Sequence, residues 1–317
     1  MTEIKIETRV IIDADANESI KKIQRDFIQF QMHCEVQSLP ITFTAQPISI
    51  QTPEKSNELP TAKYYSISVV GNIDMETDLE NDFMFNEEKE CGDDLSIVFF
   101  SDIEPIVGSY ILALALAYPE IGVSYCRAFV YINKQECNNE NYFNELCILN
   151  EMIKKHKEIL REEVTIQQAW NWIANNSNLC KRKSDTPPAL AALSYVLNRQ
   201  YPEVLMYSII GLESIFTAKE SKNTNYLLQN RITHLFPSVT KTDIKNMYQL
   251  RSEFVHGNKR IGILYSIDDQ IENEEDYKNN AMLSAALLIE SIRILIAHNA
   301  AEIEFQQTIS HTYIPCR

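Results

Sequence analysis

The chain has 317 residues, of which 45% are hydrophobic and 23% are charged, a composition typical of globular domains. At about 150 residues per domain, this length suggests two domains. Only 7 residues are glycine, and none of them forms a G-x-G-x-x-G turn. The one G-x-x-x-x-G stretch, residues 257–262, is followed by Ile263 and Leu264, where a phosphate-binding loop needs Lys and Ser or Thr. The composition therefore argues against Rossmann redox chemistry and P-loop nucleotide hydrolysis.

The formal net charge of −15 is unevenly distributed along the chain. Residues 1–180 contain 14 Lys and Arg against 29 Asp and Glu, whereas residues 181–317 contain 15 of each. Within residues 181–262 there are 12 basic and 6 acidic residues, a net charge of +6. This one segment is therefore suited to contact phosphate, although the charge of the whole chain points away from nucleic acid.

Cysteine usage and the first residues indicate the compartment. The 7 cysteines are odd in number and widely spaced, with no C-x-x-C pair, so we expect no metal site and no cofactor. No signal peptide precedes the first predicted strand, and the apolar run within residues 105–117 is too short to span a bilayer. We expect a cytoplasmic protein that does not contact membranes.

Residues 1–162 are predicted to form an α+β domain. Apolar and polar residues alternate from Ile4 to Ile12, which is the period of a half-buried strand. Further strands are expected at residues 63–70, 95–100 and 123–132, and helices at residues 106–118 and 143–162. By analogy, a domain that precedes a helical bundle in this way is expected to be a sensor, a regulator or a partner surface.

Residues 163–317 read as wholly helical. A capping box at residues 165–168 begins a helix that carries Trp170 and Trp172, and Thr186 is expected to cap a helix with proline in its first turn. Helices are expected at residues 186–199, 201–218, 225–235, 240–255 and 276–305. No repeat of 20–50 residues occurs, so an all-α bundle is predicted rather than a solenoid.

The helix at residues 240–255 ends in Arg251-Ser-Glu-Phe-Val-His256-Gly257, and this pair suits RNA cleavage. Histidine can take a proton from a ribose 2′-OH or give one to the leaving 5′-oxygen, and arginine can stabilise the charge on phosphorus without a metal. At about 100° per residue the two side chains lie about 140° apart around the helix. A site that uses both therefore needs a second facing element, most simply another copy of the chain.

The spacing alone is weakly specific, because about 0.6 matches are expected by chance in a chain with this content of Arg and His. A second match, Arg293 to His298, has isoleucine after the arginine and lies in an apolar helix, so we interpret it as structural. Trp170 and Trp172 could stack on bases, but packing is the more ordinary role.

Four stretches together resemble the HEPN superfamily, in particular its Apea-like branch. They are residues 189–199, 204–216, 226–231 and 251–257, the last matching the family's R-x4-6-H motif with a polar residue after the arginine and a glycine after the histidine. The resemblance implies an HEPN-type bundle that forms a homodimer in which two Arg–His pairs line one cleft. It also implies metal-independent endoribonuclease activity, often in bacterial defence or toxin systems.

The resemblance gives Arg251 and His256 the catalytic roles and Ser252 a supporting one. Glu213 would orient Arg251 or form a structural ion pair. Basic residues near these elements are candidate RNA contacts or exposed linker residues: Lys181, Arg182, Lys183, Lys259 and Arg260.

Three functional hypotheses remain open at this point. The first is an endoribonuclease that leaves 2′,3′-cyclic phosphate ends. The second is a non-catalytic HEPN module that binds RNA, a nucleotide or a protein partner through the same cleft. The third is that the likeness reflects only the composition of a helical bundle.

Overall fold

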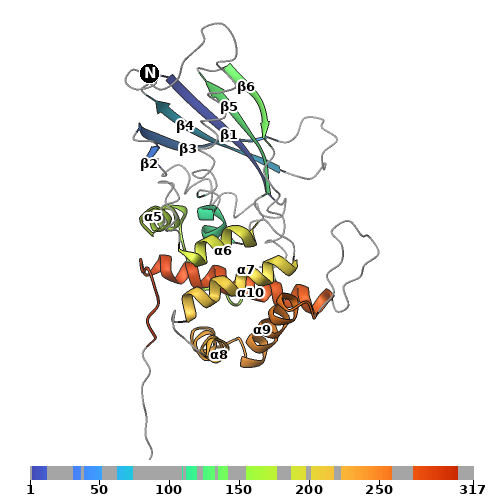
Figure 1. Cartoon of the computed structure of the whole chain (residues 1–317). Coiled ribbons are helices and arrows are strands. Elements are labelled where there is room, and N and C mark those ends of the chain that lie inside the picture. Colours follow the sequence, from blue (N-terminus) through green and yellow to red (C-terminus); the bar gives the residue numbers. More distant parts are fainter. Residues whose placement is uncertain are drawn as a thin grey trace, which may run out of the picture.

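The computed structural model places a strand-rich first part and a helical second part in one chain (Figure 1). The structure describes residues 2–12, 31–36, 39–51, 63–73, 109, 112–119, 124–132, 135–141, 155–176, 187–197, 201–217, 223–258 and 274–305. Side chains are described in the helical part, and the strands are described by their backbone pairing.

The strands form one antiparallel sheet in the order β2-β3-β4-β1-β5-β6. Their bounds are β1 Thr2–Ile12, β2 Gln31–Val36, β3 Leu39–Gln51, β4 Lys63–Ile73, β5 Ser124–Ile132 and β6 Gln135–Asn141. The predictions of β1, β4 and β5 are confirmed, whereas β2, β3 and β6 were not predicted. β3 contains Pro47 at an irregularity in its pairing with β4, where the missing N–H of proline is tolerated. The strand expected at residues 95–100 lies outside the described residues.

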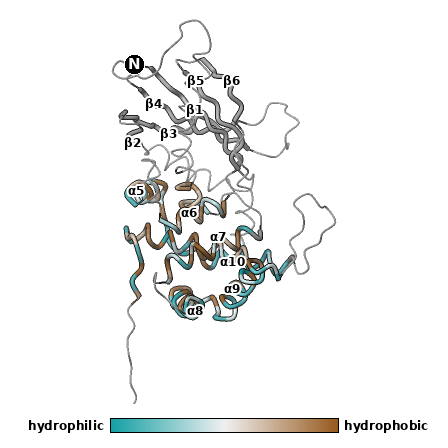
Figure 2. The backbone as a smooth tube through the Cα atoms, in the orientation of Figure 1, coloured by the Kyte–Doolittle hydropathy of each residue, from teal (hydrophilic) through white to brown (hydrophobic). Residues whose placement is uncertain are grey.

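The C-terminal part is an all-α bundle. Its helices are α5 Ile166–Asn176, α6 Pro188–Val196, α7 Tyr201–Phe216, α8 Thr224–Leu235, α9 Lys241–Val255 and α10 Glu274–Ala297. A further helical segment, residues 112–117, joins them from the first half of the chain. α10 runs through the middle and contacts α5, α6, α7 and α9. Figure 2 shows apolar residues concentrated on α6, α7 and α10, and more polar residues on α8 and α9.

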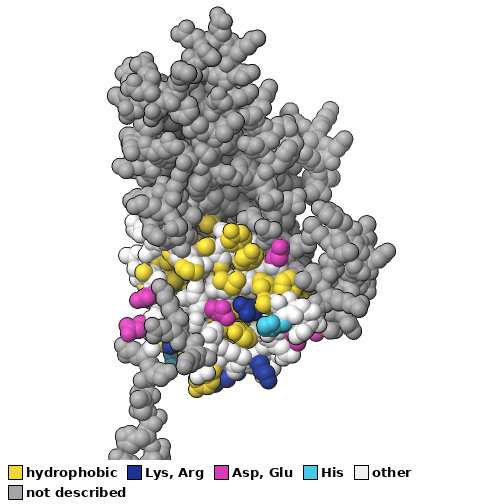
Figure 3. Space-filling view, in the orientation of Figure 1, with side chains coloured by type: hydrophobic (Ala, Val, Ile, Leu, Met, Phe, Trp, Pro, Cys, Tyr) yellow, Lys and Arg dark blue, Asp and Glu magenta, His cyan; other side chains and the backbone are white. Residues whose placement is uncertain are grey.

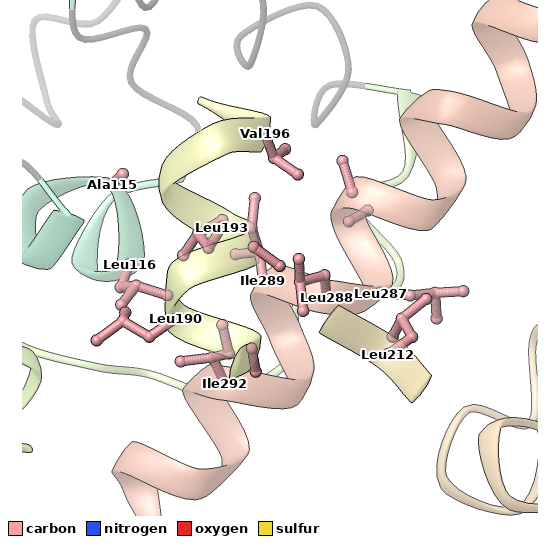
Figure 4. Packing of buried hydrophobic residues seen from close by; sticks show 14 of the residues in the cluster. Ala115, Leu116, Leu190, Leu193, Val196, Leu212, Leu287, Leu288, Ile289 and Ile292 are labelled. Carbon is pink, nitrogen blue, oxygen red and sulfur yellow. The ribbon is translucent and has the colours of Figure 1, made fainter. Parts of the chain in front are cut away.

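The core forms where α6, α7 and residues 112–117 pack on α10. Figure 4 shows Leu190 and Leu193 of α6 and Leu116 beside Ile289 and Ile292 of α10, all buried. By length and composition α10 could cross a membrane, but 78% of its most apolar window is buried inside the bundle. Packing against its neighbours accounts for that apolar surface, as in the core helix of a globular domain.

Local capping signals place two of the helix starts. Before α5, Gln168 N donates to Thr165 Oγ1 (3.2 Å) and Thr165 N donates to Gln168 Oε1 (2.9 Å), so the predicted capping box is confirmed. The predicted cap of α6 is wrong. Pro187 is the N-cap residue, with no side-chain hydrogen bond, and Pro188 opens the helix. The fixed φ of proline suits the first turn of this helix.

The helix predicted to continue to residue 162 is also corrected. From His156 the chain forms a turn, in which Ile159 N donates to His156 O (3.0 Å), and then runs on as irregular backbone. The buried carboxylate of Glu290 on α10 accepts hydrogen bonds from the backbone N–H groups of Arg161 and Glu162, both at 2.7 Å. These tertiary hydrogen bonds replace helical ones, which is why local periodicity extended the helix too far.

The last helix ends at Ala297 rather than at residue 305. Asn299 has a φ of +47°, and the N–H of Ala300 donates to Leu295 O (2.8 Å), which is a Schellman termination with asparagine in the left-handed position. Trp172 Nε1 then donates to Ala300 O (2.7 Å). Trp170 and Trp172 are both buried, so their interpretation as packing residues is confirmed.

Candidate functional site

The end of α9 is built by local backbone chemistry. Thr240 and Asp243 form a capping box at its start, and at its end Gly257 N donates to Phe254 O (3.2 Å) and Asn258 N to Glu253 O (2.9 Å). This Schellman termination needs the left-handed φ of +68° at Gly257, which side chains disfavour. The predicted end of the helix is confirmed, and His256 becomes its C-cap residue.

Arg251 is half-buried, and one of its hydrogen-bond donors is left without an acceptor. Its Nε is buried and has no hydrogen-bond partner. The guanidinium carbon lies 6.0 Å from the ring centroid of Tyr248, one helical turn earlier. A guanidinium carries five N–H donors and no acceptor, so an anionic oxygen is a chemically suitable partner for this side chain.

Glu213 lies on α7, opposite Arg251. Burial raises the pKa of the Glu213 carboxyl, and the positive charge of Arg251 partly offsets that rise. The Arg251 charge is therefore close enough to act on this carboxyl. Within the described part of the chain Arg251 Nε has no hydrogen-bond partner, so this nitrogen does not bond Glu213. The structure therefore brings these two predicted residues near each other, and their interaction is Coulombic.

His256 is exposed, whereas Arg251 is half-buried. His256 N donates to Ser252 O (3.0 Å), so the backbone of the predicted supporting residue Ser252 helps to place the histidine. The differing exposure of the two side chains agrees with the expectation that they do not share one stripe of the helix. Within one chain, Arg251 and His256 therefore occupy separate positions at the end of α9.

Large apolar side chains lie exposed on the elements that carry the site. They are Tyr195 on α6, Ile210 on α7 and Val255 on α9, at 47%, 38% and 47% exposure. Ile210 is one turn from Glu213, and Val255 immediately precedes His256, so two of these side chains are neighbours of candidate site residues along their helices. Figure 3 shows acidic, basic and histidine side chains next to one another beside hydrophobic ones on this part of the molecule.

The second match to the arginine–histidine spacing has different surroundings. Arg293 is 6% exposed and pairs with Glu290 at 3.0 Å, and its other donors bond the carbonyls of Leu116, Ala117 and Glu162. The structural interpretation of Arg293 is confirmed. His298 is not inside the helix as predicted, because α10 ends at residue 297, and its side chain is exposed.

Two tyrosines at the site were not predicted. Tyr248 lies one turn before Arg251, a spacing that could have been noticed in the sequence. Tyr277 on α10 donates its hydroxyl to the carbonyl of Leu250 (3.2 Å), and only the packing of α10 on α9 brings them together.

The predicted RNA contacts Lys181, Arg182, Lys183, Lys259 and Arg260 lie outside the described residues. Within the described ranges, no three His, Cys, Asp or Glu side chains gather as a metal site.

Comparison of the chain with protein-family models, with curated proteins and with solved structures gives no match.

Proposed function

We propose that this protein is a metal-independent endoribonuclease of the HEPN type, with its site completed across a homodimer. The observation that carries the proposal is the state of Arg251. It is a half-buried arginine whose Nε has no partner, close to a carboxylate and on the same helix end as an exposed histidine. A guanidinium that stays charged and retains an unpaired N–H can stabilise the charge that develops on a phosphodiester in its transition state.

In this mechanism the ribose 2′-oxygen attacks the adjacent phosphorus as His256 removes the 2′ proton. The bond from phosphorus to the 5′-oxygen breaks, and a proton goes to the leaving oxygen, in a dimer from the second His256. The products are a 2′,3′-cyclic phosphate and a 5′-hydroxyl. Arg251 stabilises the charge that develops on the non-bridging oxygens, and Ser252 and Glu213 support its position.

The dimer is supported by the exposed apolar patch next to the site. The side chains of Tyr195, Ile210 and Val255 are exposed, and burying their apolar surface in a dimer would be favourable. A two-fold axis near this patch would bring the Arg251 of one copy toward the His256 of the other, which one helix end cannot do.

The wider role is proposed from the resemblance and from the division of charge. An endoribonuclease of this type would act in the cytoplasm in bacterial defence or as a toxin, with residues 1–162 sensing a protein or phage-derived activator. The basic residues Lys181–Lys183, Lys259 and Arg260 would contact the RNA backbone.

A second candidate is a non-catalytic HEPN module that binds RNA, a nucleotide or a protein through the same residues. The same unpartnered Arg251 supports it, because an anion site is useful for binding without cleavage. It differs from the first candidate because it requires no proton transfer by His256.

The test is end-mapping of cellular RNA after induction of the wild type, Arg251→Ala, His256→Ala and His298→Ala. New 2′,3′-cyclic phosphate ends are expected with the wild type and with His298→Ala, the control for an exposed histidine at a helix end. Both site variants should lose them. Cleavage that persists in His256→Ala and Arg251→Ala would contradict the enzyme, and RNA binding without new ends would favour the second candidate.

A further inference from the structure

The surroundings of Arg251 are unlike those of a structural arginine in the same bundle. Arg293 donates to a carboxylate and to three backbone carbonyls, so each of its three guanidinium nitrogens is hydrogen-bonded. Arg251 instead has an aromatic face at 6.0 Å from its guanidinium carbon and a buried Nε with no acceptor. The Arg251 guanidinium therefore lies over an aromatic ring and keeps at least one N–H without an acceptor.

An aromatic ring is well suited to this purpose. It attracts a cation through its face and takes no N–H group, whereas a carbonyl or carboxylate would fill part of the planar fork. Tyr248 reaches Arg251 from the same helix at i, i+3 spacing, so the contact does not depend on another element.

A second tyrosine fixes the backbone from which Arg251 extends. Tyr277 is 3% exposed, and its hydroxyl donates to the carbonyl of Leu250, the residue before Arg251 (3.2 Å). Burial, and next to it the charge of Glu253, raise the pKa of the Tyr277 hydroxyl, which keeps it protonated as a donor. The bond ties α10 to α9 at the turn that carries the arginine.

We infer that Tyr248 and Tyr277 are positioning residues for the Arg251 guanidinium. Tyr248 supports the side chain by its ring face, and Tyr277 fixes the main chain by its hydroxyl. The inference rests on the proposed function, because it assigns to both residues an effect on RNA cleavage through Arg251.

The experiment measures initial rates of cleavage of purified total RNA by the full chain, over a range of RNA concentrations. Tyr248→Leu removes the ring face and should lower kcat about 10-fold, with KM changed by less than about 2-fold, since the lost contact acts on transition-state charge. Tyr248→Phe keeps the face and should cleave within about 2-fold of the wild type. Tyr277→Phe keeps the buried ring and should lower kcat about 3-fold.

Tyr226→Leu is the matched control, because Tyr226 is 64% exposed on α8. Thermal unfolding of every variant identifies losses that come from folding. Tyr277→Phe tests the inference even if Tyr248→Leu does not fold, since it retains the packing of the ring.

Arg251→Ala in the same assay separates a failure of the proposed function from a failure of the positioning role. If it cleaves like the wild type, the proposed function is wrong. If it is inactive while Tyr248→Leu and Tyr277→Phe behave like Tyr226→Leu, only the positioning role is wrong. Equal losses in Tyr248→Phe and Tyr248→Leu would also overturn it, because the ring face would then not be the feature that matters.

Discussion

Arg293 and Glu290 form a buried ion pair whose remaining hydrogen-bonding capacity is used by the backbone. Glu290 is 1% exposed and accepts from Arg161 N and Glu162 N as well as from Arg293 Nε. Among the described residues Arg251 Nε has no such partner, although the two arginines precede a histidine by the same five residues. At the scale of single residues, the hydrogen-bond partners rather than the spacing separate a structural arginine from a candidate for catalysis.

Replacing each arginine by methionine should therefore affect different quantities. Arg293→Met should mainly lower stability, and Arg251→Met should mainly remove the proposed activity. Arg293→Met leaves Glu290 buried without its counter-charge and should lower the free energy of unfolding by about 3–5 kcal/mol. Arg251→Met removes a buried N–H that has no acceptor and should change it by less than about 1 kcal/mol while abolishing cleavage. Chemical denaturation and the RNA cleavage assay measure the two quantities. Similar losses of stability in both variants would contradict the distinction.

The carboxyl of Glu213 should make stability depend on pH. Burial raises its folded pKa above the unfolded value of about 4.3, so the folded state retains a proton that the unfolded state releases. The contribution of this group is therefore fully present below pH 4.3, and it is lost as the pH rises through the folded pKa.

The measurement is the free energy of unfolding of the wild type and Glu213→Gln across pH 4 to 8. The wild type should lose stability relative to Glu213→Gln as the pH rises. Arg251→Met should enlarge that loss, because the positive charge of Arg251 lowers the pKa of Glu213. A difference that is constant with pH would show that Glu213 has the same pKa in both states.

At the scale of elements, a glycine sets the distance between α7 and α10. A Cβ placed on Gly211 would lie 2.6 Å from Leu288 Cδ1 and 3.1 Å from the Cβ of Ala192 on α6. Leu288 is fully buried and has little room to move. The close approach at Gly211 places the next turn of α7, with Glu213, beside α9.

Gly211→Ala should therefore destabilise the protein by about 1–3 kcal/mol, although alanine is the better helix former. Leu288→Ala alone should cost about 2–5 kcal/mol because it leaves a cavity. The double variant should cost less than the sum, since the added methyl group occupies part of that cavity. Denaturant unfolding of the four proteins completes the cycle, and strict additivity would mean that the two side chains do not meet.

Elements with local signals are the ones that the sequence predicts well. The capping box at Thr240 and the glycine at residue 257 define α9 within a residue, and with it the positions of Arg251 and His256. The chain around residues 156–162 and the end of α10 were mispredicted, because Glu290 and Trp172 reach them from distant parts of the sequence. Tyr277 was missed for the same reason. Its contact with Leu250 spans 27 residues and exists only after α9 and α10 have packed.

At the scale of the whole molecule, the bundle is not built from the second half of the chain alone. Residues 112–117 lie between β4 and β5 in sequence, yet all six are at most 6% exposed and belong to the core cluster around α10. Ile159 is buried in the same cluster, and Arg293 of α10 bonds the carbonyls of Leu116 and Ala117. The strand-rich part and the bundle therefore share a segment, which would give the sensor proposed for the first part a physical route to the second.

A fragment that begins at residue 163, the predicted domain boundary, should consequently fail to fold as a stable bundle. It lacks Leu112, Leu114 and Leu116, whose burial contributes about 1.5–3 kcal/mol each, and it leaves Arg293 without its carbonyl partners. This loss is comparable with the whole stability of an ordinary domain, about 5–15 kcal/mol. Circular dichroism during thermal unfolding should show a broad, non-cooperative transition for the fragment and a cooperative one for the full chain. Adding a peptide of residues 105–120 should restore cooperativity, whereas a peptide with all three leucines changed to serine should not. A fragment that unfolds at the same temperature as the full chain would show that residues 112–117 are dispensable to the bundle.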